Sequence, residues 1–414
     1  MNKLICIAFA VCALGAQAVT VSGVSARQRW PWNNLVDVDF TVAGTPGEAY
    51  VVEMNAVYAD GKQQLTCTSM LSEPIAHDGE NRIVWDFGRD YPDFKADDMQ
   101  VVVLVTPLTE TSPVYLVIDV SEGASATSYP IHYTTQAPVH TVGVNDPCKT
   151  TEIWLKRVKA GSGYFGGNTN YGYAKHTCTF TEDYYLGIFP VTQAQWEHVG
   201  SGTLSGHHSF FTNSLYAATR PVDSVYYSAV RDNSYNYPAD MTISQDTFIK
   251  RMRDRTGLES IDLPTEWQWE YAHRRGASNG GTHSGAYIRS VAKGNSLPEG
   301  MTTADKDGAW SEDYGTCYVD RDTPTAWGFY SMLGNVWEWC ANAYAKSAVS
   351  GGAAPEDDYK GPVSTTNYRV LCGGCWSSSS QYYCMNYSRN SLEGNKKSSS
   401  AYGFRLAMTV PKSN

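Results

Sequence analysis

Cysteine thiols are the most reactive side chains in this chain of 414 residues, and two of them, Cys372 and Cys375, form a C-x-x-C sequence. This spacing can hold a soft metal ion or carry out redox chemistry. Zinc sites commonly use two such pairs, and the chain has no second C-x-x-C. If residues 372–375 lie on a strand, the two side chains point to opposite faces and cannot share a ligand. We therefore expect a disulfide or a free buried thiol, for example a disulfide that joins Cys340 or Cys384 to a neighbour. A redox or metal-binding pair is the alternative.

The segment after these cysteines is typical of a binding surface. Residues 376–402 contain nine Ser, four Tyr, three Asn and one Gly among 27 residues. Tyr supplies rigid amphipathic area and Ser, Asn and Gly supply adaptable hydrogen bonds, as in antibody combining sites. The alternative is that these polar residues only fill exposed loops. The expected ligand contacts are Trp376, Tyr382, Tyr383, Asn386, Tyr387 and Arg389.

Two other common catalytic motifs are absent from the sequence. It contains no H-E-x-x-H and no P-loop, and His207-His208 is the only adjacent pair among nine histidines. Glu266 and Glu270 stand one helical turn apart, which is more typical of a solvated or capping pair than of an acid/base couple.

Composition and charge exclude two classes of protein. The chain has 32 basic and 42 acidic residues, a net charge of −10, and no basic block, so we expect no nucleic-acid partner. No apolar run reaches the roughly 18 residues of a membrane span, so we expect no transmembrane segment. The 28 Tyr, 12 Trp and 36 Gly favour strands, turns and irregular loops.

The first 18 residues are typical of a secretory signal peptide. Lys3 precedes an apolar stretch, Leu4 to Leu14, and Ala16-Gln17-Ala18 provides an A-x-A cleavage site. The expected location is the periplasm, the cell surface or the medium. The mature chain would keep eight cysteines, which allow up to four disulfides in 105 possible complete pairings.

Residues 19–106 predict a small all-β, immunoglobulin-like sandwich that serves as a spacer or adhesion module. Short strands are separated by Gly, Asp and Pro, and Asp60-Gly61 is a turn signal. The expected strands are 35–42, 50–58, 82–87 and 99–105. Residues 107–149 are expected to form a connector around the strand Tyr115–Val120.

The remaining residues, 150–412, predict one large domain with little regular structure. A strand at 153–158 is expected to enter a Gly-rich loop at 161–172. Two helices are expected. The first has Ser244 as its N-cap and Gly257 as its stop, with one apolar face formed by Phe248, Ile249 and Met252. The second begins with a capping box, Thr265 and Gln268.

Six segments of this domain occur in the order in which they occur in one known family. They are 184–196 (YYLGIFPVTQAQW), Arg220-Pro221-Val222, 263–272 (LPTEWQWEYA), 332–339 (MLGNVWEW), Gly373-Gly374 with Trp376, and Gly403-Phe404-Arg405-Leu406. Together they resemble the formylglycine-generating enzyme, or sulfatase-modifying factor, family. The resemblance implies an α+β, C-type-lectin-like fold with a small twisted sheet and long ordered loops.

The resemblance also implies a structural calcium loop. By position its ligands would be an oxygen of Ser331, the carbonyls of Gly334 and Val336, and the carboxylate of Glu338. Oxygen ligands of this kind suit a hard cation. The family usually has Asn or Asp at the position of Ser331.

The activity that the resemblance implies is oxidation of a sulfatase cysteine to formylglycine with oxygen and Cu(I) held by two thiolates. The family's two cysteines follow its Gly-Gly-Ser-aromatic motif and are four residues apart. Here Ser377 or Ser378 occupies the first position, the second falls at 381–383, and Cys384 lies beyond it. A hydroxyl cannot replace a thiolate for Cu(I). A displaced copper site drawn from Cys372, Cys375 and Cys384 would be needed.

Two functions therefore compete. One is an exported protein that binds a protein, glycan or small molecule through the Tyr- and Ser-rich face of a catalytically degenerate domain. Such a protein would resemble the variable proteins that retroelements diversify. Some of those proteins use the same fold, and their variable segment lies at this C-terminal position. The other is a formylglycine-generating oxidase with a relocated cysteine pair.

Overall fold

The computed structural model describes residues 19–29, 33–95, 98–166, 176–200, 209–212, 216–232, 237–238, 240–275, 315–345, 357–362, 367–378, 386–395 and 400–410. The expected signal peptide lies outside these ranges. The chain divides into two compact units. One comprises Met1–Val117 with Ile131–Ala137, and the other Ile118–Pro130 with Pro138–Asn414.

The N-terminal unit is all-β apart from one helical turn, α1 (Phe87–Asp90). Its first sheet is antiparallel in the order β1-β2-β6. In its second sheet β3 pairs with β4, β5 and β7. The strands are β1 (Thr20–Gln28), β2 (Leu35–Ala43), β3 (Ala49–Tyr58), β4 (Gln63–Thr66), β5 (Ile75–His77), β6 (Gly79–Asp86) and β7 (Gln100–Pro107). The four strands expected from the sequence are confirmed as β2, β3, β6 and β7.

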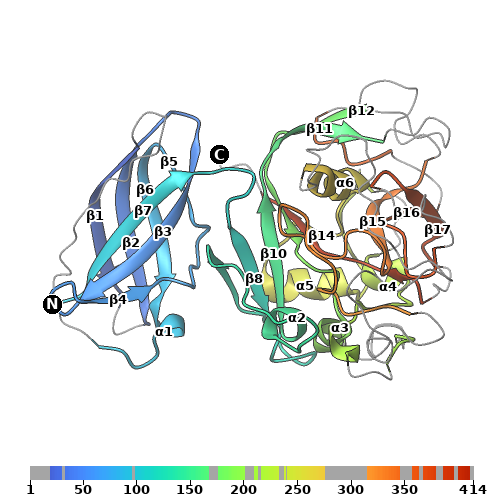
Figure 1. The fold of residues 1–414 in the computed structure, drawn as a ribbon, viewed down its shortest axis with the longest axis horizontal. Helices are drawn as coiled ribbons and strands as arrows, with labels where there is room; N and C mark the ends of the chain where they lie inside the picture. Colours follow the sequence, from blue (N-terminus) through green and yellow to red (C-terminus); the bar gives the residue numbers. More distant parts are fainter. Residues whose placement is uncertain are drawn as a thin grey trace. The chain divides into compact units, whose positions relative to one another are not determined.

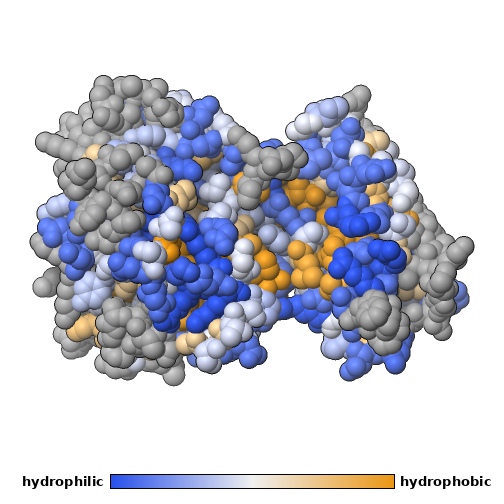
Figure 2. Space-filling model, turned by 180° about the vertical axis from the view of Figure 1, so that it is seen from behind, coloured by the Kyte–Doolittle hydropathy of each residue, from blue (hydrophilic) through white to orange (hydrophobic). Residues whose placement is uncertain are grey.

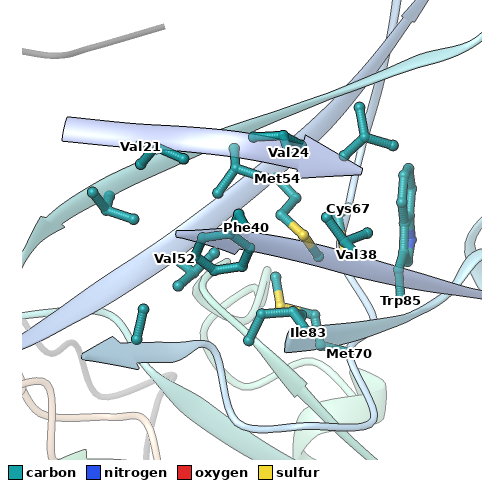
Figure 3. Packing of buried hydrophobic residues seen from close by; sticks show 14 of the residues in the cluster. Val21, Val24, Val38, Phe40, Val52, Met54, Cys67, Met70, Ile83 and Trp85 are labelled. Atoms are coloured by element: carbon teal, nitrogen blue, oxygen red, sulfur yellow. The ribbon is translucent and has the colours of Figure 1, made fainter. Parts of the chain in front are cut away.

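Alternation along these strands fills the core of this unit. Val38, Phe40 and Val42 of β2 are buried, and between them lie partly exposed residues. Figure 3 shows Phe40 and Val38 packed among Val52 and Met54 of β3. The immunoglobulin-like topology stays a prediction.

In the described part of the chain, the strands from Tyr115 onward form three further sheets (Figure 1). Their strand orders are β14-β19-β13-β10-β8-β9, β17-β16-β15-β18 and β11-β12. The bounds are β8 (Tyr115–Asp119), β9 (Ile131–Thr134), β10 (Glu152–Val158), β11 (Gly161–Phe165), β12 (His176–Phe180), β13 (Tyr184–Gly187), β14 (Ile261–Asp262), β15 (Trp337–Ala343), β16 (Tyr368–Cys372), β17 (Arg389–Glu393), β18 (Tyr402–Gly403) and β19 (Ala407–Thr409). The expected strands at 115–120 and 153–158 are therefore present. The start of the expected Gly-rich loop is wrong, because residues 161–165 pair with β12.

The two expected helices are α5 (Phe248–Thr256) and α6 (Glu266–Arg275). In α5, Phe248, Ile249 and Met252 are buried as expected, and Gly257 ends the helix with φ 74°. The predicted N-cap is wrong. The hydroxyl oxygen of Thr247 accepts a bond from the Lys250 amide at 3.2 Å, whereas Ser244 bonds to Asp232.

The capping box of α6 is confirmed. Gln268 N donates to Thr265 Oγ1 at 3.1 Å, and Thr265 N donates to Gln268 Oε1 at 2.9 Å. The shorter helices are α2 (Pro147–Thr150), α3 (Gln193–Gly200), the 3₁₀ turn η2 (Ala217–Thr219) and α4 (Tyr227–Val230).

Aromatic residues form much of the C-terminal core. Trp267 and Trp269 of α6 pack with β13, β15 and β16, and Trp196 of α3 stacks on Phe248 at 5.4 Å. On the face drawn in Figure 2, hydrophilic residues cover much of the described part of this unit. Among the described residues, no helix combines the length and the apolar character that crossing a membrane requires.

Candidate functional site

The candidate site begins where β16 ends. Gly373 and Gly374 have φ of 94° and 78°, and a Cβ on Gly373 would lie 2.7 Å from the Met332 carbonyl oxygen. Only glycine fits this turn. The turn places Trp376, whose amide donates to the Asn335 carbonyl and whose Nε1 donates to the Ser400 carbonyl, both at 2.9 Å. The indole is therefore held from two separate segments.

Trp376 ends a row of aromatic rings. Its ring meets that of Phe211 edge-on with centroids 5.3 Å apart, and Phe211 meets Phe210 edge-on at 5.0 Å. Edge-to-face contacts of this kind fix ring positions as well as burying area. Phe210 is 70% exposed, whereas Phe211 is buried and Trp376 is half-buried. We call Phe210, Phe211 and Trp376 the aromatic row.

A buried carboxylate orders the exposed end of the aromatic row. Asp223 accepts bonds from the amide of Phe210 at 2.8 Å, from the amide of Phe211 at 3.4 Å and from the hydroxyl of Ser224 at 2.7 Å. Burial raises the pKa of Asp223 above its ordinary value, and these three bonds oppose that shift. The Arg220 guanidinium lies over the Phe211 ring, 5.7 Å from its centroid. The backbone that carries the exposed Phe210 ring is thus held by a buried carboxylate.

Phe210 and Phe211 were missed by the sequence reasoning. The available signal was two adjacent aromatic residues shortly before Arg220-Pro221-Val222, in a stretch without periodicity. Nothing in their spacing shows that they meet Trp376, which is more than 160 positions later in the chain.

The other expected ligand contacts are distributed differently. Arg389 is buried: its guanidinium pairs with Glu266, donates to the Ala345 carbonyl at 2.9 Å and lies over the Tyr344 ring. Asn386 is 1% exposed, and its side-chain amide has no hydrogen-bond partner among the described residues. Tyr387 is half-buried, and Tyr382 and Tyr383 lie outside the described residues. Of the expected set, Trp376 is the one that the structure joins to the exposed aromatic row.

The cysteines of the C-x-x-C have different neighbours. Cys372 Sγ lies 3.6 Å from Cys340 Sγ, whereas Cys375 Sγ lies 3.3 Å from Ser377 Oγ and 3.6 Å from Ser378 Oγ. Burial raises the pKa of both Cys340 and Cys372, which favours thiols over the thiolates that bind metal. Cys384 lies outside the described residues.

Two residues of the expected calcium loop, Glu338 and Ser331, are bonded to protein partners. Glu338 accepts bonds from Arg405 at 2.6 and 2.7 Å and from the Trp269 indole at 2.7 Å. Ser331 donates its hydroxyl to the Val319 carbonyl at 2.8 Å. Gly334 and Val336 lie in the turn before β15. A guanidinium already neutralises the carboxylate, so the residues as arranged do not fit a divalent cation. Calcium stays a prediction of the resemblance.

Glu266 and Glu270 do not form the solvated or capping pair that we expected. Both are buried. Glu266 accepts from Arg389 and from Asn342 Nδ2 at 2.7 Å, and Glu270 pairs with Arg274 and accepts from the Gly166 amide at 3.0 Å. Burial raises the pKa of Glu270 to about 7. Each carboxylate faces its own arginine. Arg274 lies one helical turn after Glu270, as helical spacing indicates, whereas Arg389 is far from Glu266 in the sequence.

A pocket of about 160 Å³ lies away from the aromatic row, near β14 and β19. Tyr184, Tyr237, Asp262, Tyr359 and Lys360 are among the residues that line it. None of the expected ligand contacts does.

A family profile described as "Sulfatase-modifying factor enzyme 1-like domain" matches residues 144–410. The chain belongs to this family. The matched residues include the aromatic row and all six segments of the sequence resemblance. They also include the two sheets whose strands contain cysteines, β11-β12 and β17-β16-β15-β18. The α+β fold with few helices and much irregular structure agrees with this membership.

Three relatives illustrate the range of proteins that carry similar segments. Formylglycine-generating enzyme of Bos taurus is 32% identical over 159 residues, which are 35% of this chain and 38% of that protein. Serine/threonine-protein kinase pkn1 of Chlamydia pneumoniae is 31% identical over 149 residues, or 36% and 21%. The solved structure of Treponema denticola variable protein 1 has a TM-score of 0.46 at 23% identity and covers 66% of this chain and 99% of that one. The chain thus spans less than half the length of these two curated relatives.

Within the sulfatase-modifying factor enzyme 1-like domain, the place that the resemblance gives to the first copper cysteine is polar. Ser377 is exposed, and the hydroxyl of the buried Ser378 accepts a bond from the Cys375 amide at 3.0 Å. The residues that would correspond to the second cysteine, 381–383, lie outside the described part.

Proposed function

We propose that this protein is exported and binds a ligand through the aromatic row together with the Tyr- and Ser-rich residues 376–402. The observation that carries the proposal is the exposure of Phe210, which is 70%, in a loop that a buried carboxylate holds in place. An exposed, pre-ordered ring is a typical anchor in binding surfaces, because little conformational entropy remains to be lost on binding.

The chemistry of the expected copper site supports binding over oxidation. Hydroxyl groups stand where the resemblance places the first thiolate. Cys375, a thiol in contact with these hydroxyl groups, has two serine oxygens as its neighbours. A linear Cu(I) site needs two converging thiolates, and these contacts do not supply them.

One observation favours the oxidase as a second candidate. Cys340 and Cys372 form a close thiol pair at 3.6 Å. Both side chains are buried on neighbouring strands, whereas an oxidase must admit oxygen and a substrate cysteine to its metal. This burial makes binding the better supported function.

The oxidase is tested directly by loading residues 19–414 with Cu(I) and offering a Cys-x-Pro-x-Arg peptide under oxygen. Mass spectrometry follows conversion of the peptide cysteine to formylglycine. We expect no conversion. Conversion that disappears in Cys340→Ser, Cys372→Ser, Cys375→Ser or Cys384→Ser would establish an oxidase with a relocated site and overturn the proposal.

Binding is tested with a glycan array and a displayed peptide library as probes. For the probes that bind to the wild-type protein, Phe210→Ala should weaken the affinity about tenfold or more, as loss of an exposed aromatic anchor does. Tyr164→Ala is the matched control, because Tyr164 is 45% exposed but lies on β11. Equal affinity of Phe210→Ala and wild type for every retained probe would remove the aromatic row from the proposal.

A further inference from the structure

Two cysteines, Cys340 and Cys372, face each other across neighbouring strands. Cys340 lies on β15 and Cys372 at the end of β16, and their sulfur atoms are 3.6 Å apart. The residues are 0% and 4% exposed. Sulfur atoms at this separation are in van der Waals contact and can be joined by small side-chain rotations.

The strand register explains why the thiols meet. Glu338 is paired with Cys372, and Trp339 with Leu371, in an antiparallel ladder. Side chains two positions apart on a strand share a face, so Cys340 lies on the same face as Glu338 and therefore as Cys372. The strand pairing becomes irregular between Trp339 and Ala343. Cys340 and Cys372 are therefore not held at the distance of a regular diagonal pair in an antiparallel ladder.

The surroundings favour a covalent bond over a metal. Among the described residues, no group of three or more His, Cys, Asp and Glu side chains could hold a metal ion. The ionised groups that act on the pair are Glu266, Glu338 and Arg389, and each carboxylate already has an arginine partner. Glu266 and Glu338 disfavour thiolates, whereas a disulfide carries no charge and needs no counter-ion.

We propose that Cys340 and Cys372 form a disulfide that joins β15 to β16 when the chain folds in an oxidising compartment. The setting rests on the export in the proposed function. The oxidant is a disulfide carrier. One thiolate attacks one sulfur of the carrier disulfide, which forms a mixed disulfide and releases the carrier's other sulfur as a thiolate. The second protein thiolate attacks the protein sulfur of the mixed disulfide and releases the carrier sulfur bound there, so two protein thiols are oxidised and one carrier disulfide is reduced to two thiols. The sulfur atoms must approach by about 1.6 Å to reach a bond length of about 2.05 Å.

The bond would link two of the strands that support residues 376–402, the candidate binding segment. Cys372 is the last residue of β16, directly before the Gly373-Gly374 turn that places Trp376. β15 and β16 lie side by side in the sheet that also contains β17, the strand at the other end of residues 373–388 (Figure 1). A covalent link at this point would restrict opening of the strand pair on which the segment depends.

The test starts from reduced, denatured residues 19–414, because burial protects the folded thiols. The chain is refolded with reduced and oxidised glutathione, alkylated in denaturant without a reductant, and digested for mass spectrometry. We expect peptides joined through Cys340 and Cys372, with Cys148, Cys178 and Cys317 alkylated. Alkylation of Cys340 and Cys372, or a bond from either to another cysteine, overturns the proposal.

A stability measurement gives a second readout. The melting temperature of the refolded wild type should fall by roughly 5–10 °C on reduction, as expected for loss of one disulfide in a domain of this size. The double variant Cys340→Ala/Cys372→Ala should show no such fall, and the control Cys375→Ala should keep it. A fall that persists in the double variant would contradict the assignment.

These outcomes are independent of the ligand. A Cys340–Cys372 bond without any binding by the aromatic row would refute the proposed function and leave the disulfide intact. Ligand binding by a protein in which Cys340 and Cys372 are both alkylated, and therefore not disulfide-bonded, would refute the disulfide and leave the proposed function intact.

Discussion

The buried carboxylate of Glu338 is of a type that can bind either a metal ion or an arginine side chain. The family resemblance assigns it to a calcium ion, yet its two oxygens accept three bonds from Arg405 and Trp269. The guanidinium supplies the positive charge that a metal ion would otherwise supply. This ion pair connects β15 to the Gly403-Phe404-Arg405-Leu406 segment.

Removing one member of this ion pair should be strongly destabilising. We expect Glu338→Gln to lower the free energy of unfolding by about 3–5 kcal/mol, because it leaves a buried guanidinium without a counter-charge. Urea unfolding at neutral pH measures the change. The double variant Glu338→Gln/Arg405→Met should recover part of the loss. A single-variant loss below about 1 kcal/mol would show that the pair is not isolated from water.

The same arrangement predicts that calcium does not change the thermal stability of the protein. Adding calcium to chelator-treated protein should leave its melting temperature unchanged, because Arg405 occupies the carboxylate. A rise with calcium that Glu338→Gln abolishes would restore the cation site.

His273 provides a test of pH dependence at the residue scale. Its ring stacks on Trp269 at 5.8 Å, and burial, followed by repulsion from Arg274 and Arg405, lowers its pKa from 6.5 to about 3. Because the folded pKa lies below the unfolded value, the unfolded chain takes up the proton first as pH falls. The stability from neutral His273 is therefore present above about pH 6.5 and is lost toward pH 3.

The comparison variant is His273→Phe, which keeps a ring beside Trp269 and removes the titration. Between pH 7 and 5 the free energy of unfolding of the wild type should fall by about 2 kcal/mol more than that of the variant. Parallel pH profiles of wild type and variant, from urea unfolding at each pH, would contradict the buried neutral state.

At the scale of elements, local patterns predict several strands and both longer helices, but they miss others, such as β1, α3 and β15. Alternation predicted β2, and the Thr265–Gln268 pair predicted the start of α6. Ser244 was assigned as the cap of α5, although Thr247 fulfils that role. Both residues are acceptable caps by type, and the choice depends on Asp232, which binds Ser244 from 12 positions earlier.

The cap of α5 can be tested by one substitution. Thr247→Ala should lower the free energy of unfolding by about 1 kcal/mol, because the Lys250 amide loses its acceptor. Thr247→Ser keeps the hydroxyl and should cost much less. Thermal unfolding followed by circular dichroism compares the two, and equal losses would show that packing of the Thr247 methyl group, rather than capping, is responsible.

The candidate site was predictable only in part, for a physical reason. Trp376 was found because the local composition around it is distinctive. Phe210 and Arg389 were not placed correctly because their environments depend on contacts far along the chain, with Phe211 and Trp376 in one case and Glu266 in the other. Sequence patterns report local periodicity, whereas exposure and pairing are set by the assembled fold.

At the scale of the whole molecule, the chain combines an all-β unit with a sulfatase-modifying factor enzyme 1-like domain. The domain keeps the segments that build its frame, including the Arg405–Glu338 ion pair and the Gly373-Gly374 turn. It lacks the cysteine spacing on which the resemblance bases oxidation.

The two hydrogen bonds of Trp376 have a consequence for how such a protein can evolve. Its amide is held by Asn335 and its indole by Ser400, so the entrance and exit of residues 377–399 are fixed by groups outside that stretch. Neither bond depends on the side chains between them. Substitutions at exposed positions of that stretch can therefore leave both bonds in place, whereas Arg389, buried against Glu266, and strand β17 remain tied to the fold.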